Sequence, residues 1–63
     1  MLQMMEVVGT SPKSFAEATR AAVAEVARLG KKAHFFQVVE QRGSVRDGEL
    51  KEFQVVLKVA VEG

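Results

Sequence analysis

The second half of the chain alternates apolar and polar positions as expected of a long β-hairpin. Asp47-Gly48 interrupts this alternation, and the pair is typical of a two-residue hairpin turn because glycine adopts the positive φ that such turns need. We therefore expect antiparallel strands over 33–46 and 49–61. Counting outward from the turn gives the following pairs: Arg46 with Glu49, Arg42 with Phe53, and Gln41 with Gln54.

The alternation gives the predicted hairpin two different faces. The inner face is apolar and is expected to form the core; it contains Phe36, Val38, Phe53, Val55, Leu57, Val59 and Val61. The outer face mixes apolar groups with amides; it contains Phe35, Gln37, Val39, Gln41, Gln54, Val56, Lys58 and Ala60. A chain of this length has no further element to cover the outer face, so function is to be sought there.

The first half of the chain predicts a strand and a helix. The apolar run 2–8 suits a strand, and the segment from Gly9 to Pro12 suits a turn. Ser14 precedes Glu17 by three residues, which is the pattern of a capping box at a helix start. The helix is then expected to run to Leu29 and to end at Gly30.

Apolar residues recur at helical spacing in this segment and predict the side that packs on the inner face of the hairpin. This stripe is Phe15, Ala18, Ala22, Val26 and Leu29. A second set consists of Ala16, Val23, Ala24 and Ala27, which either reflects the helix propensity of alanine or contacts another subunit. The predicted fold is α+β: one β-α-β-β domain over residues 1–63, with a three-stranded antiparallel sheet wrapped around one helix.

Size and composition favour self-assembly. A chain of 63 residues buries only about 60% of the surface that its unfolded form exposes, and small domains compensate with disulfides, metals or oligomerisation. The chain has no cysteine and one histidine, His34, so disulfides and a zinc cluster are excluded. The chain has nearly equal numbers of positive and negative side chains, which argues against nucleic acid as a partner.

No apolar run reaches the roughly 20 residues of a membrane span, and the N-terminus does not have the pattern of a signal peptide. A cytoplasmic location is the expectation that follows by default. Catalytic signatures are also few: a nucleophile would have to use His34 as its base, and the predicted fold separates this residue from Ser11, Ser14 and Ser44. We predict no catalytic residue and no metal ligand. The turn at Gly9 either binds an anion or simply joins strand to helix.

Phe35 and Gln54 are the best candidates for ligand contact. On the outer face an aromatic ring can stack on a planar ligand, and an amide can both donate and accept at a heterocycle edge. They are about six residues apart along the hairpin, or roughly 20 Å, so one ligand meets both only across chains or if a bulge changes the register. Alternatively, Phe35 packs in a subunit interface. Arg42 has inner parity, which implies either a bulge near Gly43 or a carboxylate partner such as Glu40.

Three segments together resemble the dodecins, a family of small flavin-binding proteins. They are EVVGTSP at 6–12, FQVVEQRG at 36–43, and DG at 47–48 followed by FQVVLKV at 53–59. The resemblance implies a β-α-β-β subunit in a hollow homododecamer. It also implies flavin (riboflavin or FMN) at two-fold interfaces, for storage or sequestration rather than turnover; some members also bind coenzyme A.

Carried over by position, the resemblance makes Gln54 the residue that recognises the flavin edge and Arg42 the arginine of the RG motif. Phe35 stands where flavin-binding members have a stacking tryptophan, and His34 stands where an aspartate is usual. The family's C-terminal ending is replaced by AVEG. We expect a non-enzymatic flavin-binding cage with Phe35, Gln54 and Arg42 at the ligand. The alternative is a structural cage that has lost flavin or binds coenzyme A or a metal.

Overall fold

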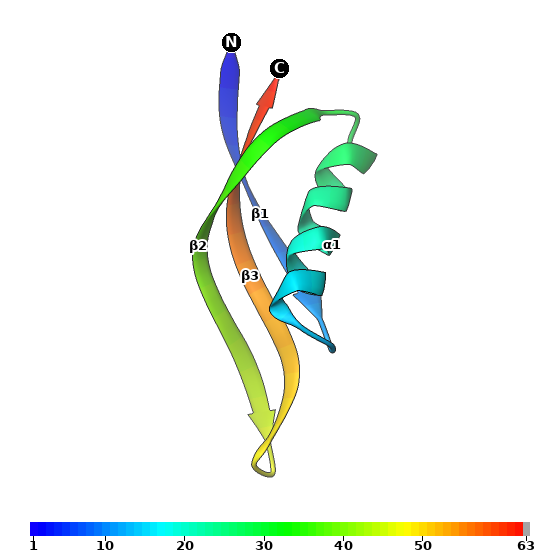
Figure 1. Ribbon diagram of the computed structural model, residues 1–63, viewed down its shortest axis with the longest axis vertical. Helices are drawn as coiled ribbons and strands as arrows, with labels where there is room; N and C mark the ends of the chain where they lie inside the picture. Colours follow the sequence, from blue (N-terminus) through cyan, green and yellow to red (C-terminus); the bar gives the residue numbers. More distant parts are fainter. Residues whose placement is uncertain (63) are drawn as a thin grey trace.

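The computed structural model describes residues 1–62 and has the predicted order of elements (Figure 1). Strand β1 spans Leu2–Ser11, helix α1 spans Phe15–Arg28, strand β2 spans Lys32–Arg46 and strand β3 spans Glu49–Glu62. The strands form one antiparallel sheet in the order β1-β3-β2, and α1 lies across one face of it. The α+β prediction is therefore confirmed.

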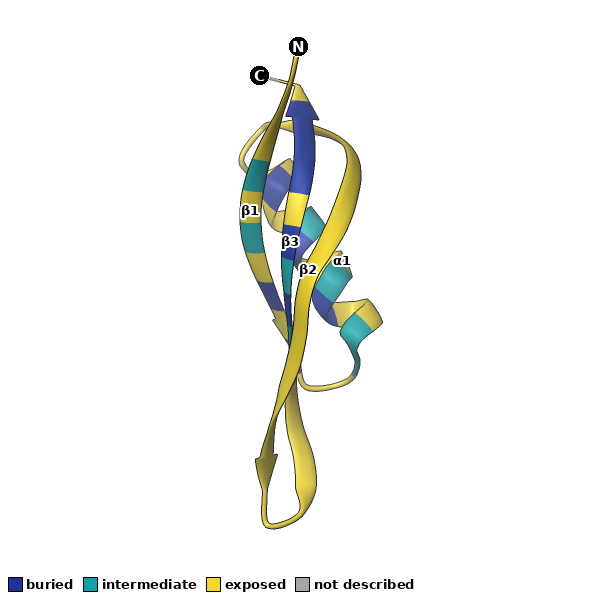
Figure 2. Cartoon of the chain, turned by 90° about the vertical axis from the view of Figure 1, so that its left-hand side faces the viewer, coloured by how far each residue is buried: buried dark blue, intermediate teal, exposed yellow. Residues whose placement is uncertain are grey.

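The core lies between α1 and strand β3, because β3 is the central strand and α1 covers its inner face. Figure 2 shows that buried residues are concentrated on β3 and on one side of α1, whereas β2 is exposed along its whole length. The buried apolar cluster consists of Ala18, Ala22, Val26, Val55, Leu57, Val59 and Val61. At one end of α1 the ring of Phe15 meets that of Phe53 edge to face, with centroids 5.0 Å apart.

Helix α1 begins and ends as the sequence predicts. The Ser14 hydroxyl accepts a hydrogen bond from the amide of Glu17 at 3.0 Å, which satisfies one of the free donors of the first turn. Leu29 is the C-cap, and Gly30 follows with φ +81°, the left-handed conformation that ends many helices. In the last turns, the hydrogen bond from Arg28 lowers the pKa of the Glu25 carboxyl.

Strand β1 is longer than predicted. The segment assigned to a turn, from Gly9 to Ser11, continues the strand and pairs with β3 as far as Phe53. Gly9 permits this because α1 passes directly over it: a Cβ at this position would lie 2.1 Å from the carbonyl oxygen of Ala18. The predicted turn is thus shortened to the residues just before Ser14.

The register of the hairpin is as predicted at the turn and again from Val38 to Phe35, and it is displaced by one residue between these two regions. Arg46 pairs with Glu49 as predicted, but a bulge between Ser44 and Val45 shifts the pairing by one residue, so Arg42 pairs with Gln54. Further irregularities follow between Val38 and Glu40 and between Ala33 and Phe35. An extra residue on one strand shifts the pairing beyond it by one position and changes the direction of the side chains there.

The bulge at Val39 exchanges the faces of the residues beyond it. Arg42, predicted on the inner side, lies on the outer face beside Gln54. Gln41, predicted on the outer face, instead lines the inner side next to Phe36 and Val38. A shift of one residue has this effect because successive side chains of a strand point to opposite faces.

Several predictions of burial are also wrong, including that of Leu29, which was expected to pack on the hairpin but is 52% exposed. Phe36 and Val38 were expected in the core, yet they are 47% and 39% exposed. One helix is too narrow to cover three strands, and α1 lies over β1 and β3 rather than over the edge strand β2 (Figure 1). Ala60 was expected on the uncovered face but is fully buried, because the larger Met4 and Phe35 stand directly opposite it on both sides.

Candidate functional site

The outer face of the sheet presents its side chains in rows that cross all three strands. One row joins Thr10, Gln54 and Arg42, and a second row, toward the other end of the sheet, joins Met4, Ala60 and Phe35. The first row is polar and the second apolar. The candidate residues therefore occupy two chemically different regions of one face.

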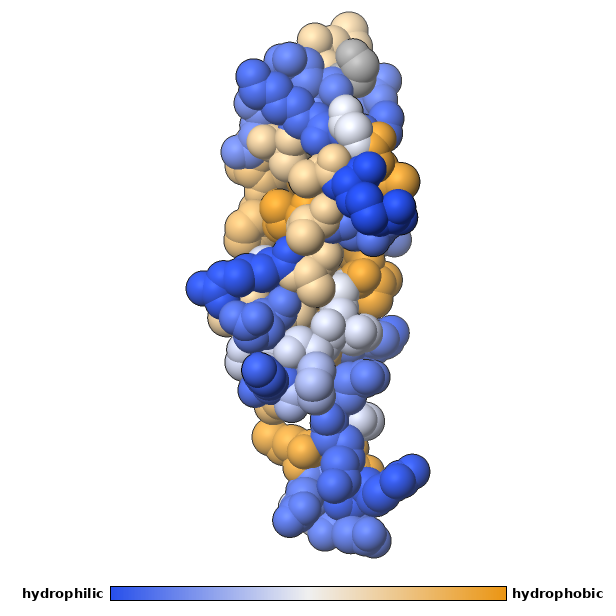
Figure 3. Space-filling view, turned by 90° about the vertical axis from the view of Figure 1, so that its right-hand side faces the viewer, coloured by the Kyte–Doolittle hydropathy of each residue, from blue (hydrophilic) through white to orange (hydrophobic). Residues whose placement is uncertain are grey.

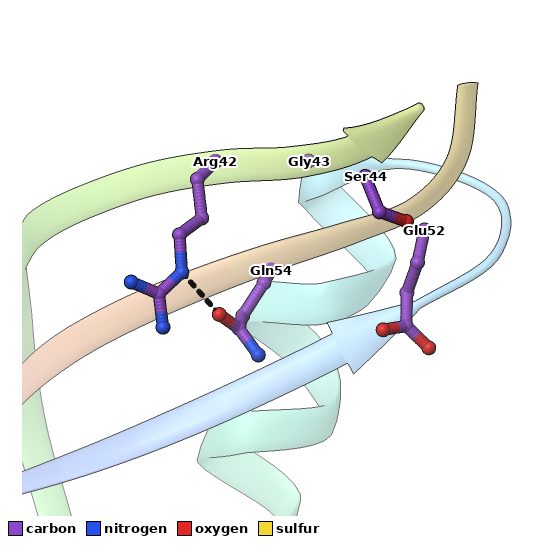
Figure 4. Close-up of a pocket in the computed structure, with 5 residues that line it drawn as sticks. All are labelled: Arg42, Gly43, Ser44, Glu52 and Gln54. Atoms are coloured by element: carbon purple, nitrogen blue, oxygen red, sulfur yellow. Dashed lines mark hydrogen bonds between the residues drawn. The ribbon is translucent and has the colours of Figure 1, made fainter. Parts of the chain in front are cut away.

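Arg42 and Gln54 are in direct contact (Figure 4). The Nε of Arg42 donates a hydrogen bond to the Oε1 of Gln54, and its guanidinium also contacts the Glu40 carboxylate at 3.3 Å. Both explanations proposed for Arg42 from the sequence, a bulge and a carboxylate partner, are therefore correct. Because Oε1 faces Arg42, the Gln54 amide nitrogen points away from it and is free to donate to a ligand.

The two side chains border a shallow depression of about 190 Å³. Its wall is completed by Gly43, Ser44 and Glu52 (Figure 4). Small-molecule pockets usually enclose about 300–1,000 Å³, so this depression holds only the edge of a planar ligand. A second surface is needed to cover the rest of such a molecule.

Phe35 lies in the other region of the face and is 56% exposed. It pairs with Ala60, which is six residues along β3 from Gln54, a separation of roughly 20 Å. The bulges thus do not bring Phe35 and Gln54 together within one chain. Next to Phe35, the His34 side chain lies 3.3 Å from the Glu62 carboxylate.

The hydroxyl groups near the start of α1 serve local structure. The Ser11 oxygen accepts from the amide of Lys13 at 3.0 Å, and the Ser14 oxygen caps α1. These contacts support the interpretation of this segment as a junction between strand and helix. Among residues 1–62, no group of three or more His, Cys, Asp or Glu is placed to hold a metal ion.

Sequence reasoning missed a second surface on the opposite side of the sheet. A groove of about 480 Å³ runs between α1 and β2, and Phe15, Phe36, Val38 and Gln41 are among its lining residues. The sequence did contain a signal for this surface: it predicts three strands but one helix, and a single helix cannot cover a third strand. We call this surface the α1–β2 groove. Within the described part of the chain, no helix is long and apolar enough to cross a membrane.

The β-α-β-β subunit with a three-stranded sheet and an exposed outer face is that of a known class of small proteins. The family model for dodecin matches residues 1–62. A curated dodecin from Thermus thermophilus is 38% identical over 55 residues, which are 87% of this chain and 80% of that protein. The chain belongs to the dodecin family.

Solved dodecin structures have the same fold. The dodecin from Streptomyces davaonensis superposes with a TM-score of 0.91 at 31% identity, covering 97% of this chain and 90% of that chain. Two variants of the T. thermophilus dodecin superpose with TM-scores of 0.90, each covering 97% of this chain and 91% of the variant. Identity is 36% to the variant with tryptophan replaced by phenylalanine and 33% to a variant with arginine replaced by alanine.

Proposed function

We propose that this protein binds a flavin, riboflavin or FMN, between subunits of a hollow homododecamer and thereby stores or sequesters it without turning over a substrate. One observation carries the proposal. The outer face of this dodecin-family sheet presents the exposed ring of Phe35 and the amide of Gln54, which is hydrogen-bonded to Arg42. The three residues at the ligand are Phe35, Gln54 and Arg42.

Phe35 supplies the stacking surface. Its ring is more than half exposed in the apolar row that it forms with Ala60 and Met4, and an exposed aromatic ring gains by packing against another flat π-system. Compared with tryptophan, the ring of phenylalanine offers less area. We therefore expect flavin affinity lower by on the order of 1 kcal/mol per stacked ring.

The variants of the T. thermophilus dodecin support this assignment. In a chain of 63 residues, a change at one position alters the sequence identity by between one and two percentage points. Identity is 36% to the variant that gained a phenylalanine and 33% to the variant that lost an arginine, so the first variant is the more similar of the two to this chain. The two substituted positions are seven residues apart in that protein, as are Phe35 and Arg42 here. These values are as expected if Phe35 and Arg42 align with the two positions.

Gln54 recognises the edge of the flavin ring, and Arg42 positions it. With its oxygen engaged by Arg42, the amide offers its NH₂ group, which matches the carbonyl oxygens at the pyrimidine edge of an isoalloxazine. The guanidinium of Arg42 has a second anchor on Glu40. This double contact restricts the rotation of the arginine and so holds the amide in one orientation.

The site is composed of two chains. The separation of roughly 20 Å between Phe35 and Gln54 along the sheet exceeds what one isoalloxazine spans, and the depression beside Gln54 holds only an edge. A two-fold contact between outer faces places Phe35 of one chain opposite Gln54 of the other. This arrangement also covers the apolar row around Ala60.

A fluorescence titration of refolded apo-protein into riboflavin and FMN tests the proposal. Stacked flavin is quenched, and we expect saturation near about one flavin per subunit, as a two-fold site with two equivalent halves requires. Phe35→Ala should abolish the quenching, whereas Leu29→Ala, which removes an exposed side chain at the C-terminal end of α1, should retain it.

Light scattering on the same samples separates the alternatives. An intact assembly that quenches neither flavin is the structural cage that has lost flavin binding, and coenzyme A or a metal would then be the next ligands to titrate. If Phe35→Ala dissolves the assembly, Phe35 is an interface residue and its role in stacking is refuted.

A further inference from the structure

An apolar row crosses the outer face of the sheet at the proposed stacking residue. Met4 and Phe35 stand on either side of Ala60; they are 50% and 56% exposed, whereas Ala60 is fully buried. Because neighbouring strands lie about 4.7–4.9 Å apart, Met4 and Phe35 are roughly 10 Å from each other. The small side chain of Ala60 thus leaves a shallow strip between two larger apolar side chains.

A planar ligand that stacks on Phe35 gains the most contact by extending along this strip toward Met4. Strand β2, which carries Phe35, is an edge of the sheet, so a ring system that extended the other way would leave the protein surface. Over Ala60, in contrast, the far end of the ligand meets Met4, whose polarizable thioether packs favourably against aromatic rings. The chain that supplies the stacking ring therefore also brings a sulfur atom to the ligand.

Met4 is one of the few side chains of this protein that are readily oxidised. The sequence has no cysteine, tryptophan or tyrosine, and it has three methionines and one histidine, His34. A methionine thioether is oxidised to the sulfoxide, which is polar. The benzene ring of Phe35 has no comparable reactivity, so the thioether nearest to a ligand stacked on this ring is that of Met4.

The three methionines lie in three different surroundings. Met1 begins the chain and is fully exposed. Met5 packs against the buried cluster between α1 and the sheet; Figure 3 views the molecule from this helix side, where hydrophilic and apolar side chains are mixed. Of the two methionines in β1, only Met4 shares a face with Phe35. An oxidant that diffuses freely favours Met1, whereas an oxidant held on Phe35 favours Met4.

We propose that Met4 is a modification site: its thioether contacts the bound flavin and is oxidised to the sulfoxide when the complex absorbs light. Flavins accept electrons singly or in pairs, and absorbed light makes them stronger oxidants. The inference rests on the proposed function, because it requires a flavin stacked on Phe35. It goes beyond that function in assigning a chemical fate to a residue of the chain itself.

The oxidation of Met4 uses water and dissolved dioxygen as co-reactants. The sulfur gives up two electrons to the flavin and gains the oxygen atom of one water molecule, whose two hydrogens leave as protons. These electrons and protons reduce the flavin, and dioxygen then takes them up and becomes hydrogen peroxide. One thioether, one water and one dioxygen thus give one sulfoxide and one hydrogen peroxide. Water reaches the sulfur because Met4 lies on an edge strand, β1.

Illumination of the refolded protein with bound riboflavin tests the site. The sample is exposed in air with catalase, which removes hydrogen peroxide, and tandem mass spectrometry then locates oxygen within the N-terminal peptide, which contains all three methionines. We expect one added oxygen, about 16 Da, on Met4 well before Met1 or Met5. In water labelled with oxygen-18 the increase should be about 18 Da.

Two controls separate contact with the flavin from intrinsic reactivity. Hydrogen peroxide in the dark, without riboflavin, should oxidise the exposed Met1 at least as fast as Met4. Met5→Leu removes the neighbouring thioether on the other face of β1, and light should still oxidise Met4 in this variant at the wild-type rate.

Oxidation should also weaken the site, because the sulfoxide places a polar group in the apolar row. Riboflavin titration after illumination should therefore give a higher Kd than before, and treatment with methionine sulfoxide reductases should restore the original value. An unchanged Kd in protein whose Met4 is fully oxidised would contradict contact between Met4 and the flavin.

Three further results would overturn the inference while leaving the flavin proposal intact. The first is protein that quenches riboflavin but gains oxygen at Met1 or His34 before Met4. The second is the same preference for Met4 with hydrogen peroxide in the dark. The third is oxygen in the sulfoxide that comes from dioxygen and not from water. Protein that does not quench riboflavin at all would instead contradict the proposed function, and the inference with it.

Discussion

Strands β2 and β3 pair along their length, yet they differ in burial over the part of the sheet that packs against α1. On β3, Val55, Leu57 and Val59 are fully buried, whereas every residue of β2 is exposed. The difference arises from position: β3 is the central strand and packs against α1, whereas β2 is an edge strand, the one that α1 contacts least. One strand stabilises the subunit, and the other is available for contacts between subunits and with a ligand.

The strongest test of this comparison uses a directly paired residue from each strand, Leu57 and Val38. Leu57→Ala should lower the free energy of unfolding by about 2–5 kcal/mol, because it opens a cavity in a fully buried site. Val38→Ala should leave the fold of the subunit nearly unchanged and instead weaken assembly. Urea denaturation at several protein concentrations separates the two effects. Equal losses that do not depend on concentration would contradict the comparison.

A second test concerns the approach of α1 to β1. Gly9→Ala places a Cβ where the carbonyl of Ala18 now lies, so the helix must move, and we expect a cost of about 1–3 kcal/mol or more. Gly30→Ala is the matched comparison: its Cβ meets open space, and only the positive φ opposes it. Thermal unfolding should show a larger loss of stability for Gly9→Ala than for Gly30→Ala. The reverse order would contradict the close approach of α1 to β1 at Gly9.

On the open side of the comparison, Phe35→Trp should strengthen flavin binding. A larger stacking surface adds on the order of 1 kcal/mol, or about five-fold in Kd. Riboflavin titration followed by fluorescence measures this, with Val39→Trp as the control for an added indole on the same strand. If Phe35→Trp still quenches flavin but with unchanged affinity, Phe35 does not contact the flavin.

The smallest effect is expected at the exposed Glu25–Arg28 pair. Arg28 lowers the pKa of Glu25 in the folded chain, so its stabilisation is present above the unfolded pKa of the carboxyl and is lost as pH falls through the folded one. Exposed pairs of this spacing contribute little. Glu25→Gln should therefore not shift the midpoint of thermal unfolding measurably at neutral pH, and a large shift would indicate a contact beyond Arg28.

The parts of the fold that local signals determine were predictable from sequence. Asp47-Gly48 located the turn because few residue pairs adopt its dihedral angles, and Ser14 marked the start of α1 through a contact three residues away. The bulges at Val39 and near Lys51 were not predictable, because they depend on how two long strands accommodate each other. They nevertheless decide that Arg42, and not Gln41, stands beside Gln54.

For the candidate site, sequence identified Phe35 and Gln54 as outer-face residues and indicated that they meet only across chains. It did not reveal the α1–β2 groove, which depends on where α1 settles on the sheet. Alternation assigns a residue to a face of a strand but not the number of strands that a helix covers. For this reason Phe36 and Val38 were expected in the core and are instead exposed.

The central claim is that each flavin site combines Phe35 of one chain with Gln54 of another. The most direct test is to refold Phe35→Ala and Gln54→Ala chains separately and together, and to titrate riboflavin into each. Neither variant alone should quench flavin. A mixed assembly should recover roughly a quarter of the wild-type sites, because random mixing at two-fold contacts makes half of the interfaces mixed and leaves one intact site in each. No recovery in a mixed assembly of full size would contradict a site shared between chains.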